Sequence, residues 1–181
     1  MNNCYTLTIG GLTRELPIIP VSDTVSIASF VILGDTEIVS RTAPLLAEKL
    51  PEVDVLVTAE AKGIPFVYEL AKQMGMARYV VARKNVKPYM KDPLINEVVS
   101  ITTQKKQTLC LDKQDRDLLY GKKVALIDDV ISTGESLKAL EKLTENAGGI
   151  VAAKAAILAE GNAADRKDII FLEKLPLFPA K

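Results

Sequence analysis

The chain has 181 residues, of which 48% are hydrophobic, and its 23 basic residues balance its 23 acidic residues. This length suits one domain with a sizeable core, and the balanced charge gives no reason to expect a nucleic acid or an anionic membrane as partner. No uninterrupted apolar run is long enough for a membrane span, and the basic and then apolar layout of a signal peptide is not seen, so we expect neither. The chain contains no histidine, which excludes histidine acid–base catalysis and most transition-metal sites.

The two cysteines, Cys4 and Cys110, lie far apart in the sequence. They form neither a disulfide framework nor the spacing of a zinc site. We interpret them as reduced thiols, and we therefore expect a cytoplasmic protein.

The hydrophobic pattern predicts an alternation of strands and helices that is typical of a parallel sheet with right-handed crossovers. It begins with a β-hairpin over residues 4–20 that turns at Gly10-Gly11. Asp35 or Thr36 is expected to cap a helix that runs to about Leu50, with a kink or a second start at Pro44. The further expected elements are a strand at 53–58, a helix at 64–74, a strand at 78–82, two β-like pieces at 97–102 and 106–111, a strand at 124–127, a helix at 135–146, and strands at 150–159 and 169–172.

The most informative stretch is VALIDDVISTGESL, residues 124–137. An apolar run typical of a buried parallel strand is followed by Asp128 and Asp129, and then by a small polar turn that leads into a helix. Unpaired backbone N–H groups at a helix N-terminus favour an anion, and Gly134 lets the backbone approach it closely. Two carboxylates beside a phosphate are explained if they accept hydrogen bonds from sugar hydroxyls, so the expected ligand is a phosphorylated ribose.

This stretch resembles the phosphoribosyl-pyrophosphate (PRPP) motif of the type I phosphoribosyltransferases. Many members have Gly-Gly-Thr where this chain has Gly134-Glu135-Ser136, and an acidic side chain in the first helical turn suits the helix dipole. The resemblance runs in the correct order from about Leu50 to about Leu158. It implies an α/β fold with a mostly parallel, Rossmann-like sheet flanked by helices, a small N-terminal hood and a mobile β-hairpin.

The expected organisation is a single phosphoribosyltransferase domain over residues 1–181. We divide it into a hood at 1–35, an α/β core at 36–160 and a C-terminal strand and tail at 161–181. The core includes a flexible loop at 85–112, which carries the β-hairpin.

Two further segments resemble the pyrophosphate-binding parts of the purine phosphoribosyltransferases. The loop VTAEAKG, residues 57–63, follows an expected strand, at the end where ligands of open α/β sheets bind. The adenine enzymes have arginine where this chain has Lys62, which keeps the charge but loses the bidentate fork. The resemblance implies that Ala61, Lys62, Arg83 and Lys87 bind pyrophosphate.

The resemblance also implies the roles of the PRPP motif. Asp128 and Asp129 would be the catalytic pair, holding the ribose hydroxyls directly or through a Mg²⁺ ion that accompanies PRPP. The 5′-phosphate would be bound by Ser132, Thr133, Gly134, Glu135 and Ser136. The hairpin near 95–108 would close over the site and exclude water.

The nucleobase is less closely determined. The adenine enzymes carry a glutamate in the hairpin, where this chain has SITTQ at 100–104, closer to the xanthine enzymes. The xanthine enzymes in turn have a polar hood residue and a lysine after the late strand, which are missing here at Ile32 and after Glu160. We favour adenine, with xanthine, hypoxanthine or guanine as alternatives, and expect Phe30 and Val31 to contact the base.

The resulting expectation is a purine-salvage enzyme that makes a nucleoside 5′-monophosphate and pyrophosphate from PRPP and a free purine base. We expect a homodimer, with residues 84–91 near its interface, and no nucleic acid or membrane partner. The alternative is a non-catalytic, PRPP-binding regulator. Such repressors usually carry an added DNA-binding domain and a basic face, for which this chain has neither room before Leu50 nor net positive charge.

Overall fold

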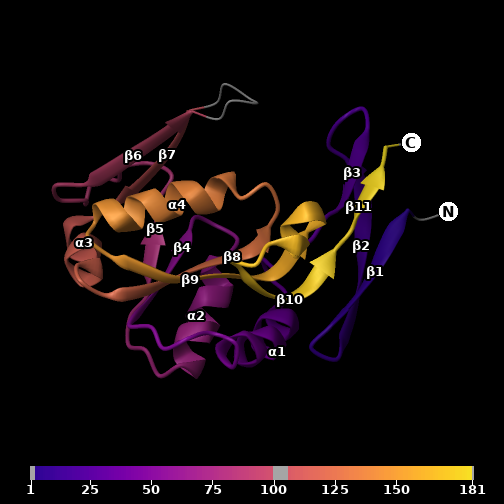
Figure 1. The fold of residues 1–181 in the computed structure, drawn as a ribbon, viewed down its shortest axis with the longest axis horizontal. Coiled ribbons are helices and arrows are strands. Elements are labelled where there is room, and N and C mark those ends of the chain that lie inside the picture. Colours follow the sequence, from indigo (N-terminus) through magenta and orange to yellow (C-terminus); the bar gives the residue numbers. More distant parts are fainter. Residues whose placement is uncertain (1–2, 100–105, 181) are drawn as a thin grey trace.

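Five parallel strands form the centre of the computed structural model, which describes residues 3–99 and 106–180 (Figure 1). Their order is β10-β9-β8-β4-β5. Side chains of the inner strands are buried on both faces, as expected for a parallel sheet covered by helices. The strands are β4 (Val55–Ala59), β5 (Val80–Ala82), β8 (Lys123–Ile131), β9 (Ile150–Glu160) and β10 (Ile170–Leu175).

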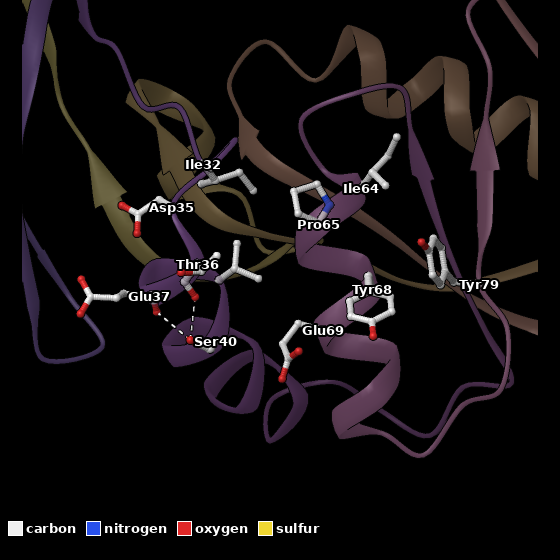
Figure 2. A pocket seen from close by; sticks show the side chains of 12 residues that line it. Ile32, Asp35, Thr36, Glu37, Ser40, Ile64, Pro65, Tyr68, Glu69 and Tyr79 are labelled. Atoms are coloured by element: carbon white, nitrogen blue, oxygen red, sulfur yellow. Dashed lines mark hydrogen bonds between the residues drawn. The ribbon is translucent and has the colours of Figure 1, made fainter.

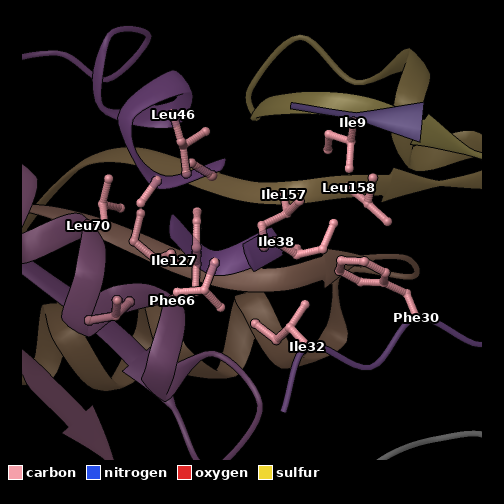
Figure 3. Packing of buried hydrophobic residues seen from close by; sticks show 14 of the residues in the cluster. Ile9, Phe30, Ile32, Ile38, Leu46, Phe66, Leu70, Ile127, Ile157 and Leu158 are labelled. Carbon is pink, nitrogen blue, oxygen red and sulfur yellow. The ribbon is translucent and has the colours of Figure 1, made fainter. Parts of the chain in front are cut away.

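Helices cover both faces of this sheet (Figure 1). On one face lie α1 (Thr36–Ala47) and α2 (Ile64–Gln73), whose apolar side chains pack on alternate residues of β8 and β9. Figure 3 shows this cluster, which includes Ile38, Leu46, Phe66, Leu70, Ile127 and Ile157. On the other face lie α3 (Lys113–Leu119) and α4 (Glu135–Asn146), with the hairpin β6 (Leu94–Val99) and β7 (Lys106–Leu111) packed beside them.

A separate four-stranded sheet forms the hood, in the order β1-β2-β3-β11. The first three strands are β1 (Cys4–Ile9), β2 (Leu12–Pro20) and β3 (Val25–Ala28). The fourth, β11 (Leu177–Pro179), comes from the end of the chain and pairs antiparallel with β3. The rings of Tyr5 and Phe178 lie 5.7 Å apart between centroids, so both ends of the described chain meet in the hood.

The predicted α/β fold is confirmed, and α4 has the predicted bounds. Three expectations were wrong in detail. Helix α1 ends at Ala47 rather than at Leu50, and Pro44 lies inside one continuous helix with no second start. Strand β8 continues to Ile131, so the two aspartates lie within the strand rather than after it.

Four short elements were missed altogether, namely α3, β3, β11 and the 3-10 helix η1 (Gly161–Asp165). Helix α3 has seven residues, KQDRDLL, too few to show an apolar repeat. Strands β3 and β11 have four and three residues and are stabilised by pairing with each other across most of the sequence. Within the two described ranges, no helix is both long and apolar enough to cross a bilayer.

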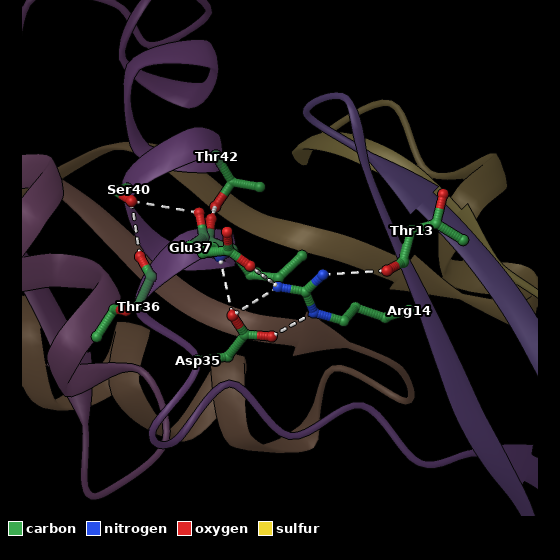
Figure 4. A network of polar contacts seen from close by, with 8 residues as sticks. Thr13, Arg14, Asp35, Thr36, Glu37, Ser40 and Thr42 are labelled. Carbon is green, nitrogen blue, oxygen red and sulfur yellow. Dashed lines mark hydrogen bonds and ion pairs between the residues drawn. The ribbon is translucent and has the colours of Figure 1, made fainter.

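An ion-pair network joins the hood to α1 (Figure 4). Arg14 of β2 donates from Nε to Oδ2 of Asp35 at 2.7 Å, from Nη2 to Oδ1 of Asp35 at 3.1 Å, and from Nη2 to Glu37 at 2.7 Å. Asp35 also caps α1, because its Oδ1 accepts the backbone N–H of Ile38 at 3.1 Å. The hydrogen bonds from Arg14 lower the pKa of Asp35, so its carboxylate stays charged near neutral pH.

We expect Asp35→Ala to lower the free energy of unfolding by about 1 to 2 kcal/mol, because it removes a helix cap and the main partner of Arg14. Glu37→Ala is the matched control, since that side chain is 69% exposed and its loss leaves the cap intact. Urea unfolding followed by circular dichroism measures both. Equal losses for the two variants would show that the cap contributes nothing.

Candidate active site

The sheet places a crevice between the carboxyl ends of β4 and β8. The crossover through α2 leads from β4 to β5, whereas the crossover through α4 leads from β8 to β9, in the opposite direction along the sheet. The chain therefore diverges between two neighbouring strands, and at such a switch point the loops leave room for a ligand. The loops at this point are residues 60–63 after β4 and residues 132–134 after β8.

A cavity of about 560 Å³ opens at this switch point. Five residues predicted from the sequence contribute to its lining, namely Ala61, Lys62, Asp128, Asp129 and Ser136. The other lining residues come from the same strand ends, from the turn after β5 and from β7: Ala59, Glu60, Lys84, Asn85, Thr108, Leu109 and Val130. The structure thus brings together, at one place, segments that lie far apart in the sequence.

The two aspartates lie next to each other in a poorly solvated environment. Asp129 has a side chain only 4% exposed, and the ammonium of Lys62 lies 2.9 Å from its Oδ2. The backbone N–H of Asp129 donates to Oδ1 of Asp128 at 2.8 Å. Burial and the nearby charge of Asp129 raise the pKa of Asp128 to about 7, although the charge of Lys62 opposes this change.

The polar turn after β8 forms a second, smaller hollow of about 100 Å³. Ser132, Thr133, Gly134 and Ser136 line it together with Asp128. Gly134 has a φ angle of 80°, in the left-handed region that glycine adopts most readily, and it is the N-cap of α4. The hollow therefore lies at a helix N-terminus, where backbone N–H groups and the helix dipole attract an anion.

The loop after β4 packs closely on its own strand. A Cβ atom at Gly63 would lie 2.2 Å from the hydroxyl oxygen of Thr58, so no larger residue fits there without a shift. That hydroxyl is buried and accepts or donates no hydrogen bond among the described residues. The peptide bond between Glu60 and Ala61 is cis.

Glu60 organises the turn after β5. One of its oxygens accepts the backbone N–H of Lys84 at 2.8 Å, and the other lies 2.9 Å from Nε of Arg83. The hydrogen bond from Lys84 and the charges of Arg83 and Lys87 lower the pKa of Glu60. The backbone of Arg83 also pairs with Cys110 of β7, with N–O distances of 2.9 and 2.8 Å.

The cations predicted to bind pyrophosphate do not all line the cavity. Lys62 lines the cavity, whereas Arg83 and Lys87 are not among the described residues that line it. Asn85 and Thr108 also line the cavity and were not predicted from the sequence. A signal for Asn85 was present, because it follows directly on the basic pair after a buried strand, but Thr108 reaches the cavity only through the hairpin.

The expected base-contacting residues lie elsewhere. Phe30 is 6% exposed and packs into the core cluster with Leu158 and Ile9 (Figure 3), whereas Val31 is 55% exposed. Neither is among the described residues of the cavity lining. The hairpin residues 100–104, in which a catalytic glutamate is missing from the sequence, lie outside the described residues.

The site fits a metal ion that a ligand brings with it. Among the described residues, no group of three or more His, Cys, Asp or Glu side chains is arranged to hold a metal by itself. Asp128 and Asp129 offer carboxylate oxygens at the cavity wall. Mg²⁺ prefers oxygen ligands and is commonly held by one or two carboxylates, water and substrate phosphates, which matches this donor set.

The raised pKa of Asp128 predicts how stability depends on pH. An unfolded aspartate titrates near roughly 3.9, so between that pH and about 7 the folded chain binds more protons than the unfolded chain. Stability therefore falls as pH rises through this window. We expect Asp128→Asn to be more stable than the unchanged protein at about pH 8, by on the order of 1 kcal/mol, and to lack this part of the slope.

Urea unfolding near pH 5 and near pH 8 tests this expectation, with Asp23→Asn, an exposed aspartate, as control. The amide oxygen that Asp128→Asn introduces can still accept the backbone N–H of Asp129, so the variant keeps that contact. If Asp128→Asn were less stable than the unchanged protein at the higher pH, the assignment of a raised pKa to Asp128 would be contradicted.

A model of the family described as phosphoribosyl transferase domain matches residues 37–175. The adenine phosphoribosyltransferase of Thermosipho africanus (strain TCF52B) is 31% identical over 142 residues, which cover 77% of this chain and 80% of that protein. The enzyme of the same name from Thermosipho melanesiensis is 28% identical over 155 residues, covering 84% and 85%.

Solved structures agree with this. The crystal structure of adenine phosphoribosyltransferase from Thermoanaerobacter pseudethanolicus has a TM-score of 0.70 and 25% identity, covering 88% of this chain and 95% of that one. The Trypanosoma brucei adenine enzyme, solved in complex with AMP, pyrophosphate and ribose-5-phosphate, has the same fold, with a TM-score of 0.62, 15% identity, and coverage of 79% and 67%. The chain therefore belongs to the type I phosphoribosyltransferase family, and it is an enzyme of the pentosyltransferase class.

Proposed function

We propose that this enzyme salvages a purine, with adenine as the favoured base. It would transfer the 5-phosphoribosyl group of PRPP to a ring nitrogen of the base, giving a nucleoside 5′-monophosphate and pyrophosphate. The observation that carries this proposal is the switch-point cavity. Its lining includes the aspartate pair and Lys62, whose ammonium contacts Asp129, and Asp128 and Ser136 also line the small hollow at the start of α4.

The sugar and its phosphate would lie along the end of β8. Asp128 and Asp129 would accept hydrogen bonds from the ribose hydroxyls, and the raised pKa of Asp128 would fall when these donors arrive. The 5′-phosphate would be held in the hollow at the start of α4 by Ser132, Thr133, Gly134, Glu135 and Ser136, mainly through backbone N–H groups.

The pyrophosphate end would lie toward the loop after β4. Ala61 allows close approach of the backbone, and Lys62 supplies a half-exposed cation at the cavity wall. Arg83 and Lys87 would join from the turn after β5, for which Arg83 has to exchange its contact with Glu60 for one with the ligand. Lys84 already lines the cavity and is a further cation for this end.

The reaction would break the bond between the anomeric carbon and the pyrophosphate oxygen and form a bond from that carbon to the base nitrogen, with inversion. The electron pair of the broken bond leaves with pyrophosphate, and the proton that the base nitrogen loses passes to the pyrophosphate or to water. Mg²⁺, bound through PRPP and near Asp128 and Asp129, would stabilise the negative charge that develops on the leaving group. The ammonium of Lys62 would also stabilise the negative charge on the leaving pyrophosphate.

The relatives support adenine as the first base to test, since their names specify it. The alternatives are xanthine, hypoxanthine and guanine. Of the two residues expected to contact the base, Phe30 is buried in the core, whereas Val31 is exposed and remains our candidate. Cys4 and Cys110 are both free thiols, in keeping with the reducing cytoplasm that we propose as the location.

A homodimer is part of the same proposal. An open apolar hollow of about 570 Å³ lies between the start of α1 and the start of α2 (Figure 2). Ile64, Pro65, Tyr68 and Tyr79 form much of its apolar wall, and Tyr68 is 56% exposed; the carboxylates of Asp35, Glu37 and Glu69 also line it. Val31 and Leu33, next to its lining residue Ile32, are also more than half exposed. A concentration of exposed apolar groups of this kind is typical of an interface, here with a second copy of the chain.

The central test is pyrophosphate release from PRPP and Mg²⁺ with adenine, hypoxanthine, guanine, xanthine or no base. We expect turnover with adenine, and a loss of at least about 100-fold when Asp128 and Asp129 are both replaced by asparagine. The matched control carries Asp23→Asn and Glu52→Gln, the same charge change at exposed positions.

If only hypoxanthine, guanine or xanthine gave turnover, that base rather than adenine would be the substrate. PRPP binding without turnover on any base would favour the non-catalytic regulator. Near-normal turnover in the doubly substituted variant, with its circular dichroism spectrum unchanged, would contradict the role of the aspartate pair.

We expect light scattering to give twice the mass of one chain, and Tyr68→Arg to shift the protein toward the monomer because it places a charge in the apolar hollow. Ile150→Arg is the control, at a side chain 58% exposed at the amino end of β9, away from this hollow. A monomeric unchanged protein, or a dimer that both variants keep equally, would contradict this interface.

A further inference from the structure

A positively charged residue lies against the phosphate hollow from outside the PRPP motif. Arg166 follows the short 3-10 helix η1 (Gly161–Asp165), more than thirty residues after Gly134. A Cβ atom at Gly134 would lie 2.6 Å from Nη1 of Arg166. The guanidinium therefore covers the α-carbon of the residue at which α4 begins, and it occupies the space that a side chain at this position would need.

The orientation of this guanidinium is fixed from the side away from Gly134. Nε of Arg166 donates to Oδ1 of Asp168 at 2.9 Å, and Nη2 donates to Oδ2 at 2.7 Å. This bidentate contact holds the planar group more firmly than a single bond would. It leaves Nη1, the nitrogen nearest Gly134, without an acceptor among the residues that the structure describes.

The ion pair of Arg166 and Asp168 is connected to the core through Lys154 and, beyond it, Glu141. Lys154 of β9 lies 3.7 Å from Asp168 and 2.7 Å from Glu141 of α4. Glu141 lies on the same helix that Gly134 caps, so the segment carrying Arg166 is tied to α4 at its first residue and near its middle. Arg166 and Lys154 are 27% and 19% exposed, and their charges are screened less than those of surface residues.

We propose that Arg166 is a positioning residue for the 5′-phosphate of PRPP, an inference that rests on the proposed function of this site. Glycine can adopt many backbone conformations, and the guanidinium packed against Gly134 would restrain it in the left-handed conformation that the structure shows at the N-cap of α4. Nη1 also places positive charge beside the helix N-terminus, which strengthens its attraction for a phosphate.

This role differs from that of a simple surface ion pair. A surface pair would contribute little to stability and nothing to ligand binding. A residue that shapes the phosphate loop acts on the affinity for PRPP and leaves the bond-breaking step, at the far side of the ribose, almost unchanged.

Arg166→Gln tests the inference, with Lys167→Gln as the matched control. Both variants lose one positive charge from neighbouring positions, but Lys167 is exposed and makes no contact that the structure records. We expect Arg166→Gln to raise KM for PRPP about 10-fold, with kcat and KM for the base within about 2-fold. Lys167→Gln should leave all three unchanged. Arg166→Lys should recover part of the loss, because it keeps the charge without the fork.

Calorimetric titration with ribose 5-phosphate and with pyrophosphate separates this inference from the proposed activity. We expect Arg166→Gln to weaken ribose 5-phosphate about 10-fold and pyrophosphate not at all. This result would support the inference even if no base gave turnover, in which case only the proposed reaction fails.

Three outcomes would overturn the inference. The first is an equal effect of both glutamine variants, which would indicate a general loss of charge. The second is equal weakening of the two ligands. The third is a lower kcat and melting temperature with KM for PRPP unchanged, which would mean that Arg166 serves the fold alone.

Discussion

The structure depends on burying two adjacent carboxylates at the end of its central strand. Strand β8 lies in the middle of the sheet; Asp129 is buried there and Asp128 is partly buried, so water solvates their charges poorly. Lys62 reaches from the loop after β4 to Asp129 and offsets part of the free-energy cost of desolvating the carboxylates. Another part of this cost is avoided because the pKa of Asp128 rises toward neutrality. A ligand that brings hydroxyl donors and a divalent cation would offset the remaining desolvation cost. Under the proposed function, the instability of this pair without a ligand and its affinity for PRPP would have the same physical origin.

Two cations near the cavity are each paired with a carboxylate. Lys62 is paired with Asp129, and Arg83 is paired with Glu60, whose other oxygen fixes the turn at Lys84. In the free protein the positive groups are therefore held by carboxylates of the site itself. Under the proposed function, a pyrophosphate would have to compete with these carboxylates for Lys62 and Arg83. In this structure Arg83 is not among the described residues that line the cavity, whereas Lys84 next to it is.

Local sequence predicted what local interactions determine. The bounds of α4 follow from its leucine repeat and from the glycine at its N-cap, and the loops after β4 and β8 follow from buried strands that end in small or charged residues. What could not be predicted depends on contacts between distant segments. Strand β11 has three residues and exists because β3 is there to pair with it. Thr108 reaches the cavity through the fold of the hairpin, and Arg166 reaches Gly134 through a turn after β9, and neither placement has a signature in its own neighbourhood.

The run of chain after β9 connects two parts of the molecule that are otherwise separate. From Glu160 it passes through η1 to Arg166 beside Gly134, continues through β10 on the edge of the parallel sheet, and ends in β11 as the fourth strand of the hood (Figure 1). The hood is joined to the core a second time, where Arg14 binds the N-cap of α1. With two attachments at different places, the hood cannot swing about a single hinge without breaking either the Arg14 network or the pairing of β11 with β3. The position of the hood, the part expected to cover the base, is thus coupled by one short segment to the loop expected to hold the phosphate.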